Sequence, residues 1–143
     1  MRRLLHGLAP ILLACGGSDP ASGPKLLSVG GTYQTAVTLI ASGCPNTQVQ
    51  TFPTTVVHSP GAPVLQLVHA GSTYSGTVAN TGAFSTPAQA FTIGGVNYSI
   101  SMTGTFELQS MNAVVTVQAA LAPPCQFSAR WTGPKQGAPN VFP

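Results

Sequence analysis

One stretch of the sequence decides the fold class: from Val96 to Leu108 the chain reads VNYSISMTGTFEL. Apolar side chains and Gly104 take every second position of these thirteen residues, and polar side chains from Asn97 to Glu107 take the positions between them. Strict alternation of this length is typical of an antiparallel strand with one buried face, and a helix does not produce it. We therefore expect a β-strand here, with a bend or bulge at Gly104.

The same period of two extends along the chain on both sides of this stretch. It predicts about eight strands, at residues 31–42, 47–58, 63–69, 72–79, 83–92, 95–108, 111–121 and 124–132. Sequential hairpins without an intervening helix indicate an all-β antiparallel meander. We expect residues 30–132 to form a small closed barrel, because an even number of strands can close and so remove its edges. A β-sandwich is the alternative, and residues 133–143 are expected to be a loose C-terminal tail.

Two short turns set the register of neighbouring strands. Ala70-Gly71 and Gly94-Gly95 each fit a two-residue hairpin of the primed type. The turns pair Leu67 with Tyr74 and Phe91 with Tyr98, in agreement with the apolar pattern. Large side chains fill most of the predicted inner face, so we expect a mostly filled interior. They are Tyr33, Leu39, Leu65, Leu67, Tyr74, Phe91, Ile93, Tyr98, Ile100, Met102, Phe106, Phe127 and Trp131.

The N-terminus has the composition of an export signal. A basic start, Met1-Arg2-Arg3, precedes an apolar run that ends in Leu12-Leu13-Ala14-Cys15, and a segment rich in Gly, Ser and Pro follows. The run is too short for a bilayer span, which takes about 20 apolar residues. The stretch resembles the signal of bacterial lipoproteins, in which the cysteine of this motif is lipidated and becomes the first mature residue. An ordinary cleaved signal is the alternative.

The resemblance implies a signal peptide at residues 1–14 and a flexible tether at residues 15–29 that carries acyl chains on Cys15. The protein would then be anchored to a membrane of the cell envelope. In the family, the residue after the cysteine helps to sort lipoproteins between membranes. Gly16, in place of an aspartate, favours the outer membrane in a cell that has two.

The small number of cations in the sequence argues against a nucleic-acid partner. Without the signal, Lys25, Arg130 and Lys135 stand against Asp19 and Glu107, and three cations minus two anions leave a net charge of +1. Three cations spread along the chain cannot form the basic patch that nucleic-acid binding needs. We expect no nucleic-acid partner.

The remaining cysteines predict a disulfide. Cys44 and Cys125 are an even pair in a chain that reads as exported to an oxidising compartment. Neither belongs to a Cys-x-x-Cys motif of the kind that redox and metal sites use. A bridge between them would close a loop of about 80 residues.

The sequence offers no constellation for catalysis. Asp19 and Glu107 are its only acids, so a carboxylate pair for glycoside hydrolysis and the acid of a Ser-His-Asp triad are both missing. No glycine-rich phosphate-binding motif occurs. His58, His69 and Glu107 match no zinc spacing. We expect no enzyme activity, no cofactor and no metal.

A second resemblance concerns ligand binding. Gly31-Thr32-Tyr33 opens the first strand, and Arg130-Trp131 lies in the last. The arrangement is similar to the lipocalin pattern, where Gly-x-Trp begins the first strand and a late arginine packs across the tryptophan; here the aromatic residue is Tyr33. The resemblance implies an up-and-down barrel that holds a small apolar ligand.

These observations predict a non-enzymatic structural or interaction module of the cell envelope. Its partners would be the membrane, through the acyl chains on Cys15, and an envelope protein. The alternative is a carrier or sensor that binds a small apolar molecule in the barrel mouth, near His69, Tyr74 and Met111.

Overall fold

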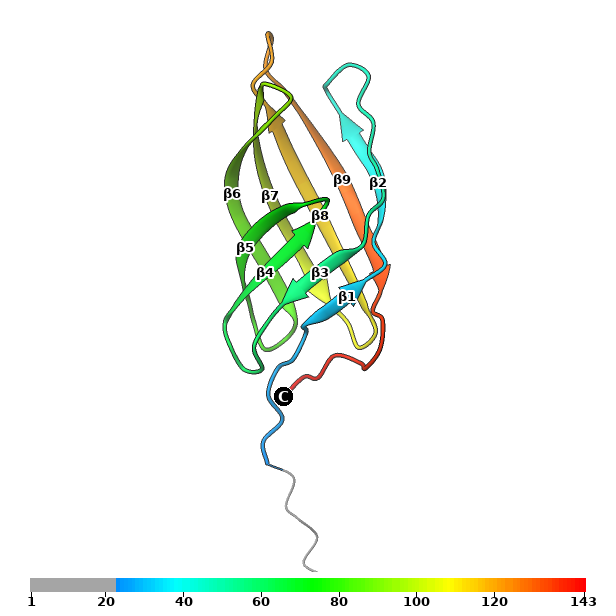
Figure 1. Ribbon diagram of the computed structural model, residues 1–143, viewed down its shortest axis with the longest axis vertical. Coiled ribbons are helices and arrows are strands. Elements are labelled where there is room, and N and C mark those ends of the chain that lie inside the picture. The colour runs from blue at the N-terminus through cyan, green and yellow to red at the C-terminus, as the bar shows by residue number, and fades with distance from the viewer. Residues whose placement is uncertain (1–22) are drawn as a thin grey trace, which may run out of the picture.

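The computed structural model describes residues 23–143, so the predicted signal peptide and Cys15 lie outside the described residues. The described chain forms one antiparallel nine-stranded sheet without a helix, and it therefore contains no helix able to cross a membrane (Figure 1). The prediction of an all-β antiparallel meander is confirmed. The strands are β1 Gly31–Tyr33, β2 Ala36–Ser42, β3 Thr54–Val57, β4 Val64–His69, β5 Ser72–Val78, β6 Ala83–Ile93, β7 Val96–Phe106, β8 Ser110–Ala119 and β9 Cys125–Pro134.

The register that the turns predicted is confirmed. Leu67 pairs with Tyr74 across β4 and β5, and Phe91 pairs with Tyr98 across β6 and β7. The bend or bulge predicted at Gly104 is wrong, because its pairing with Ala113 continues an unbroken register. Gly104 instead permits a close approach: a Cβ there would lie 2.4 Å from a backbone oxygen of β8 and 2.7 Å from the Phe84 ring.

The sheet does not form the predicted closed barrel of eight strands. It is a curled half-barrel with the order β1-β3-β4-β5-β6-β7-β8-β9-β2, in which β1 and β2 occupy opposite edges. The predicted strand at residues 31–42 is divided in two, because the chain bends after Tyr33 and β2 pairs with β9 instead of following β1 along β3. One early segment thus contributes both edge strands.

At the end of the sheet that holds the C-terminus, which we call the lower end, β9 continues past the start of β2 and forms the edge there (Figure 1). This edge is hydrogen-bonded to the opposite edge, at β1. The Gln34 amide donates to the Pro134 carbonyl at 2.9 Å, and the Gln136 amide donates to the Thr32 carbonyl at 2.8 Å. Gly133 allows this approach, since a Cβ there would lie 2.4 Å from the Gln34 carbonyl oxygen. At the opposite, upper end, β2 and β6 have no such connection among the described residues.

The sheet opens where β6 leaves β5. Only Ser85 and Phe84 of β6 pair with β5, and the register of β6 then shifts between Thr86 and Gln89. Pro87 lies inside this shift and has no amide hydrogen to donate. The Gln89 side chain replaces part of the lost ladder, because it accepts from the Ser75 amide at 3.1 Å and donates to the Ser75 carbonyl at 3.3 Å. Above this point β6 pairs with β7 alone.

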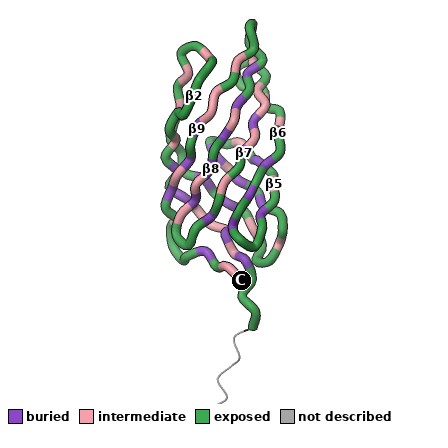
Figure 2. The backbone as a smooth tube through the Cα atoms, turned by 180° about the vertical axis from the view of Figure 1, so that it is seen from behind, coloured by how far each residue is buried: buried purple, intermediate pink, exposed green. Residues whose placement is uncertain are grey.

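The buried side chains lie mainly in the lower half of the molecule (Figure 2). This half agrees with the filled interior that we predicted, whereas two residues of the predicted inner face, Leu39 and Ile93, are exposed. Two residues of the predicted tether, Leu27 and Val29, are also fully buried in the core. The packed region therefore begins before residue 30.

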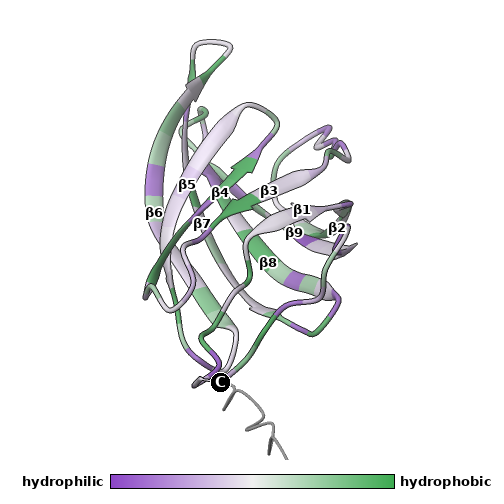
Figure 3. Ribbon diagram, turned by 60° about the horizontal axis from the view of Figure 1, so that its bottom comes forward, coloured by the Kyte–Doolittle hydropathy of each residue, from purple (hydrophilic) through white to green (hydrophobic). Residues whose placement is uncertain are grey.

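The C-terminal residues belong to this packed region and are not a loose tail. β9 continues to Pro134, and Val141 forms a bridge with Ser28. Asn140 is 2% exposed; its side chain donates to the Glu107 carbonyl and lies 2.8 Å from the Tyr33 hydroxyl. The tail closes the lower end, which Figure 3 brings forward. The polar partners of Asn140 lie far away in the sequence, so no local pattern announces this packing.

The predicted disulfide between Cys44 and Cys125 is confirmed, with 5.2 Å between the two Cα atoms. Cys125 begins β9, and Cys44 lies just after β2, its neighbour in the sheet. The bridge therefore joins two adjacent strands at the upper end, where the sheet is open. There it holds the segment that follows β2 against the rest of the fold.

We predict that reduction of this bridge lowers the free energy of unfolding by about 4–5 kcal/mol, because it frees a loop of this length in the unfolded chain. Thermal unfolding with and without reductant measures the effect. A Cys44→Ala/Cys125→Ala variant is the control and should melt at the same temperature under both conditions. An equal melting temperature for the oxidised and reduced protein would contradict the prediction.

Candidate functional site

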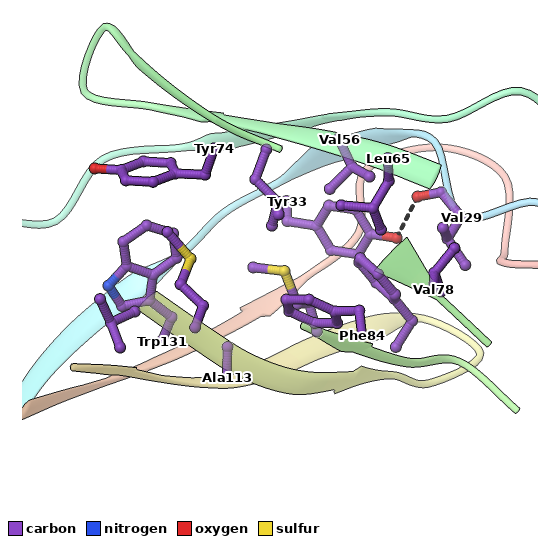
Figure 4. Packing of buried hydrophobic residues seen from close by; sticks show 14 of the residues in the cluster. Val29, Tyr33, Val56, Leu65, Tyr74, Val78, Phe84, Ala113 and Trp131 are labelled. Carbon is purple, nitrogen blue, oxygen red and sulfur yellow. Dashed lines mark hydrogen bonds between the residues drawn. The ribbon is translucent and has the colours of Figure 1, made fainter. Parts of the chain in front are cut away.

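A layer of aromatic side chains separates the packed lower half from the open upper half. The His69 imidazole stacks on the Trp131 indole, with 4.0 Å between ring centroids and 27° between planes. Phe52 meets the other side of His69 edge-on, and Tyr74 lies between Trp131 and Phe91. Figure 4 shows Tyr74 and Trp131 at one end of the hydrophobic cluster, away from Tyr33 and Val29. Five different segments contribute to the layer, which therefore connects distant parts of the sheet.

Hydrogen bonds fix His69 in this layer. The Thr35 hydroxyl donates to the Thr54 hydroxyl at 2.8 Å, and Thr54 Oγ1 lies 2.8 Å from His69 Nδ1. In the neutral tautomer that carries its hydrogen on Nε2, Nδ1 accepts a hydrogen bond from the Thr54 hydroxyl. Burial lowers the pKa of His69 from 6.5 to about 4, so the ring is neutral near pH 7.

Above this layer lies an apolar groove of about 360 Å³ on the concave face of the sheet. Its floor and sides come from β6, β7, β8 and β9, and its lining contains no charged residue. Ile100 and Val117 are buried at its base, whereas Ile93 and Leu121 are exposed at its rim. The side chains that line this groove are Ile93, Tyr98, Ile100, Val117, Ala119, Leu121 and Phe127. A volume above about 300 Å³ is within the range of small-molecule sites.

Residues 44–48 form the remaining wall of the groove. This segment is ordered by local hydrogen bonds: the Ser42 and Thr47 hydroxyls lie 2.6 Å apart, and Thr47 donates to the Cys44 carbonyl. The disulfide then attaches the segment to β9. The groove therefore has a wall that local bonds and a covalent bridge hold in place.

A second hollow, of about 570 Å³, lies at the same end and shares Tyr98 and Ala119 with the groove. Its other lining residues lie mainly on the opposite face of the sheet, where polar side chains such as Gln118 and Gln126 are exposed. The concave groove is the better candidate for an apolar ligand, because large apolar side chains such as Ile100, Val117 and Phe127 line it. The second hollow is lined mainly by small and polar residues.

The structure brings two of the three predicted ligand-binding residues together. His69 and Tyr74 both contact Trp131 in the aromatic layer. The position predicted for Met111 is wrong: this residue is fully buried at the lower end, where it pairs with Phe106 and Gly133. β4 and β8 run in the same direction in the meander, so the end of β4 and the start of β8 lie at opposite ends of the sheet.

Sequence reasoning missed two contributors to the site. Phe52 lies inside the predicted strand at residues 47–58, but that prediction is wrong for residues 47–53: β3 begins at Thr54, and Phe52 precedes it in a segment without regular structure. The wall at residues 44–48 depends on where the chain turns after β2. The pair of cysteines was the one signal in the sequence that this segment returns to β9.

The other polar candidates are dispersed. His58 receives a hydrogen bond from the Val29 amide and binds the Ala62 carbonyl, and Glu107 accepts from Ser110. Residues 23–143 contain no group of three His, Cys, Asp or Glu side chains that could hold a metal ion. The cation beside Tyr33 is Lys135, with Nζ 6.0 Å from the ring centroid, whereas Arg130 is exposed on the face opposite Trp131. No family model, curated protein or solved structure matches the chain.

We predict that protonation of His69 destabilises the fold. Between pH 6.5 and about 4 the unfolded chain binds a proton at this residue that the folded protein does not. Its contribution is complete above pH 6.5 and is lost as the pH falls to about 4, by about 3 kcal/mol in all. Urea unfolding at a series of pH values measures this loss.

A His69→Gln variant should lose this part of the pH dependence, because glutamine does not titrate. A His58→Gln variant is the matched control and should keep it. If wild type and His69→Gln show the same dependence of stability on pH, His69 is not the responsible group.

Proposed function

We propose that this protein is a lipid-anchored, non-enzymatic binding module of the cell envelope whose groove takes a small, uncharged, apolar ligand. The observation that carries the proposal is the apolar groove of about 360 Å³ on the concave face of the sheet, with Ile100 and Val117 buried at its base. The lipoprotein-like signal at Cys15 supports the anchored location. Gly16 favours the outer membrane where a cell has two membranes.

The chemistry of the lining selects the class of ligand. Ile100, Val117 and Phe127 offer dispersion contacts to a ligand. The hydrophobic effect would drive an apolar ligand from water into the groove. A charged ligand would lose its hydration without gaining an opposite charge in the groove. Tyr98 supplies a hydroxyl group that can form one directional hydrogen bond. The wall adds the polar residues Asn46, Thr47 and Gln48. A neutral molecule with an apolar body and few polar groups fits these properties.

The position of the groove agrees with an anchored carrier or sensor. The described chain begins at the lower end, beside the C-terminus, whereas the groove opens at the upper end (Figure 1). A lipid on Cys15 would therefore hold the lower end near the membrane and leave the groove accessible from the aqueous side.

A structural or interaction module that binds no small molecule is the second candidate. The observation that favours it is the filled lower half, which resembles the core of a purely structural domain. The two candidates differ in whether the groove is occupied.

We predict that the protein binds the neutral apolar fluorophore N-phenyl-1-naphthylamine, and that Ala119→Trp weakens this binding at least tenfold. Ala119 lines the groove, so the added indole would fill it without reaching the lower core. Fluorescence titration measures the binding. Ala83→Trp, on the exposed face of β6, is the matched control and should bind like wild type.

Native mass spectrometry of the exported protein is the companion measurement. A mass excess released on unfolding would identify a natural ligand. Absence of both a co-purified ligand and fluorophore binding, or equal binding by wild type and Ala119→Trp, would contradict the carrier and leave the structural module.

We predict that the full chain, expressed in a bacterial host and extracted from its membranes, has lost residues 1–14 and gained acyl chains on Cys15. Intact-mass spectrometry measures both changes. A Cys15→Ala variant should gain no acyl mass. A soluble protein cleaved without acylation would instead indicate an ordinary signal peptide.

A further inference from the structure

Large apolar side chains are exposed at the lower end, away from the groove. Leu108 and Val64 are 62% and 59% exposed, so most of each side chain faces the solvent. Scattered apolar side chains are ordinary on a protein surface, but a cluster at one end indicates a contact. The members of this cluster, which we call the basal patch, are Leu26, Val57, Val64, Leu108 and Val141.

Backbone contacts connect the segments that carry the basal patch. The Gly61 amide, in the turn between Val57 and Val64, donates to the Leu27 carbonyl, and the Leu26 side chain lies beside the same glycine. Further hydrogen bonds join Ser28 to Val141 and Asn140 to Leu108. The segments that carry the patch are therefore neighbours in the fold, and its members are not unrelated surface positions.

We infer that the basal patch is a membrane-contact surface, which rests on the phospholipid bilayer to which the chain is anchored. The inference rests on the anchored location in the proposed function, but not on the groove. Seven residues, 16–22, separate Cys15 from Gly23, the first described residue, so eight Cα-to-Cα steps connect the two. At full extension they span at most about 28 Å, so a lipid on Cys15 keeps the lower end close to the bilayer.

The charges near the basal patch agree with a lipid surface. Lys25 is exposed directly before Leu26 and can approach lipid phosphates, while the patch side chains enter the interface. Glu107, the nearby anion, accepts hydrogen bonds from Ser110 and Asn112. Contact through the base would also orient the groove away from the membrane.

The test places a tryptophan at either end of the full chain. Leu108→Trp lies in the basal patch, and Ile93→Trp, at the groove rim, is the control; both positions are exposed, so neither change alters packing. Val64→Trp is a second basal variant in case Leu108→Trp is unstable. Each protein is measured in vesicles of phosphatidylethanolamine and phosphatidylglycerol, with ordinary and with brominated acyl chains. Trp131 provides the same buried background in every variant.

We expect brominated lipid to quench the added fluorescence of the basal tryptophans and to leave Ile93→Trp unchanged. The mass of each preparation reports acylation independently. Acyl chains without basal quenching overturn the membrane contact and leave the anchor. Basal quenching without acyl chains supports the contact and overturns the anchor, and the absence of both overturns both.

Discussion

Hydrogen bonds between residues 32–34 and 134–136 join the two edges of the sheet at one end, and the rest of the architecture depends on this closure. A sheet with one apolar face has to cover that face. In the lower half, next to the closure, opposite strands cover one another and side chains fill the interior. Above this half, β6 has left β5 at Pro87 and the concave face remains partly uncovered. Closure at one end therefore produces both the stable core and the groove.

Local sequence rules predicted what depends on neighbouring strands. The period of two placed β7 because each side chain alternates between core and solvent, and the two-residue turns placed Leu67 opposite Tyr74 because a tight turn leaves one register. The Cys44–Cys125 bridge followed from counting cysteines. His69 and Tyr74 flank one short turn and face the same side, and both contact Trp131, although neither lines the groove.

Contacts between distant segments were outside the reach of these rules. The bend after Tyr33 divides the predicted strand at residues 31–42 between the two edges of the sheet. The alternation of apolar residues continues through the bend and gives no sign of it. The burial of Asn140 depends on Glu107 and Tyr33, which no local motif links to it. Met111 shows a different error, since the order of antiparallel strands already places the start of β8 away from the end of β4. Strand direction, and not face alone, has to be followed to locate a site.

The two ends of the molecule then have different chemistry for connected reasons. The closed end contains the first described residue and the C-terminus. It also exposes Leu108 and Val64, and few charged side chains lie on the surface around them. The open end presents an apolar groove, and a disulfide holds one wall of this groove in place. A protein free in solution would be prone to self-association through both surfaces. Anchoring at the closed end would cover the basal patch with lipid and leave the groove available to a ligand. The low surface charge, which would favour self-association in solution, is therefore consistent with a place at a membrane.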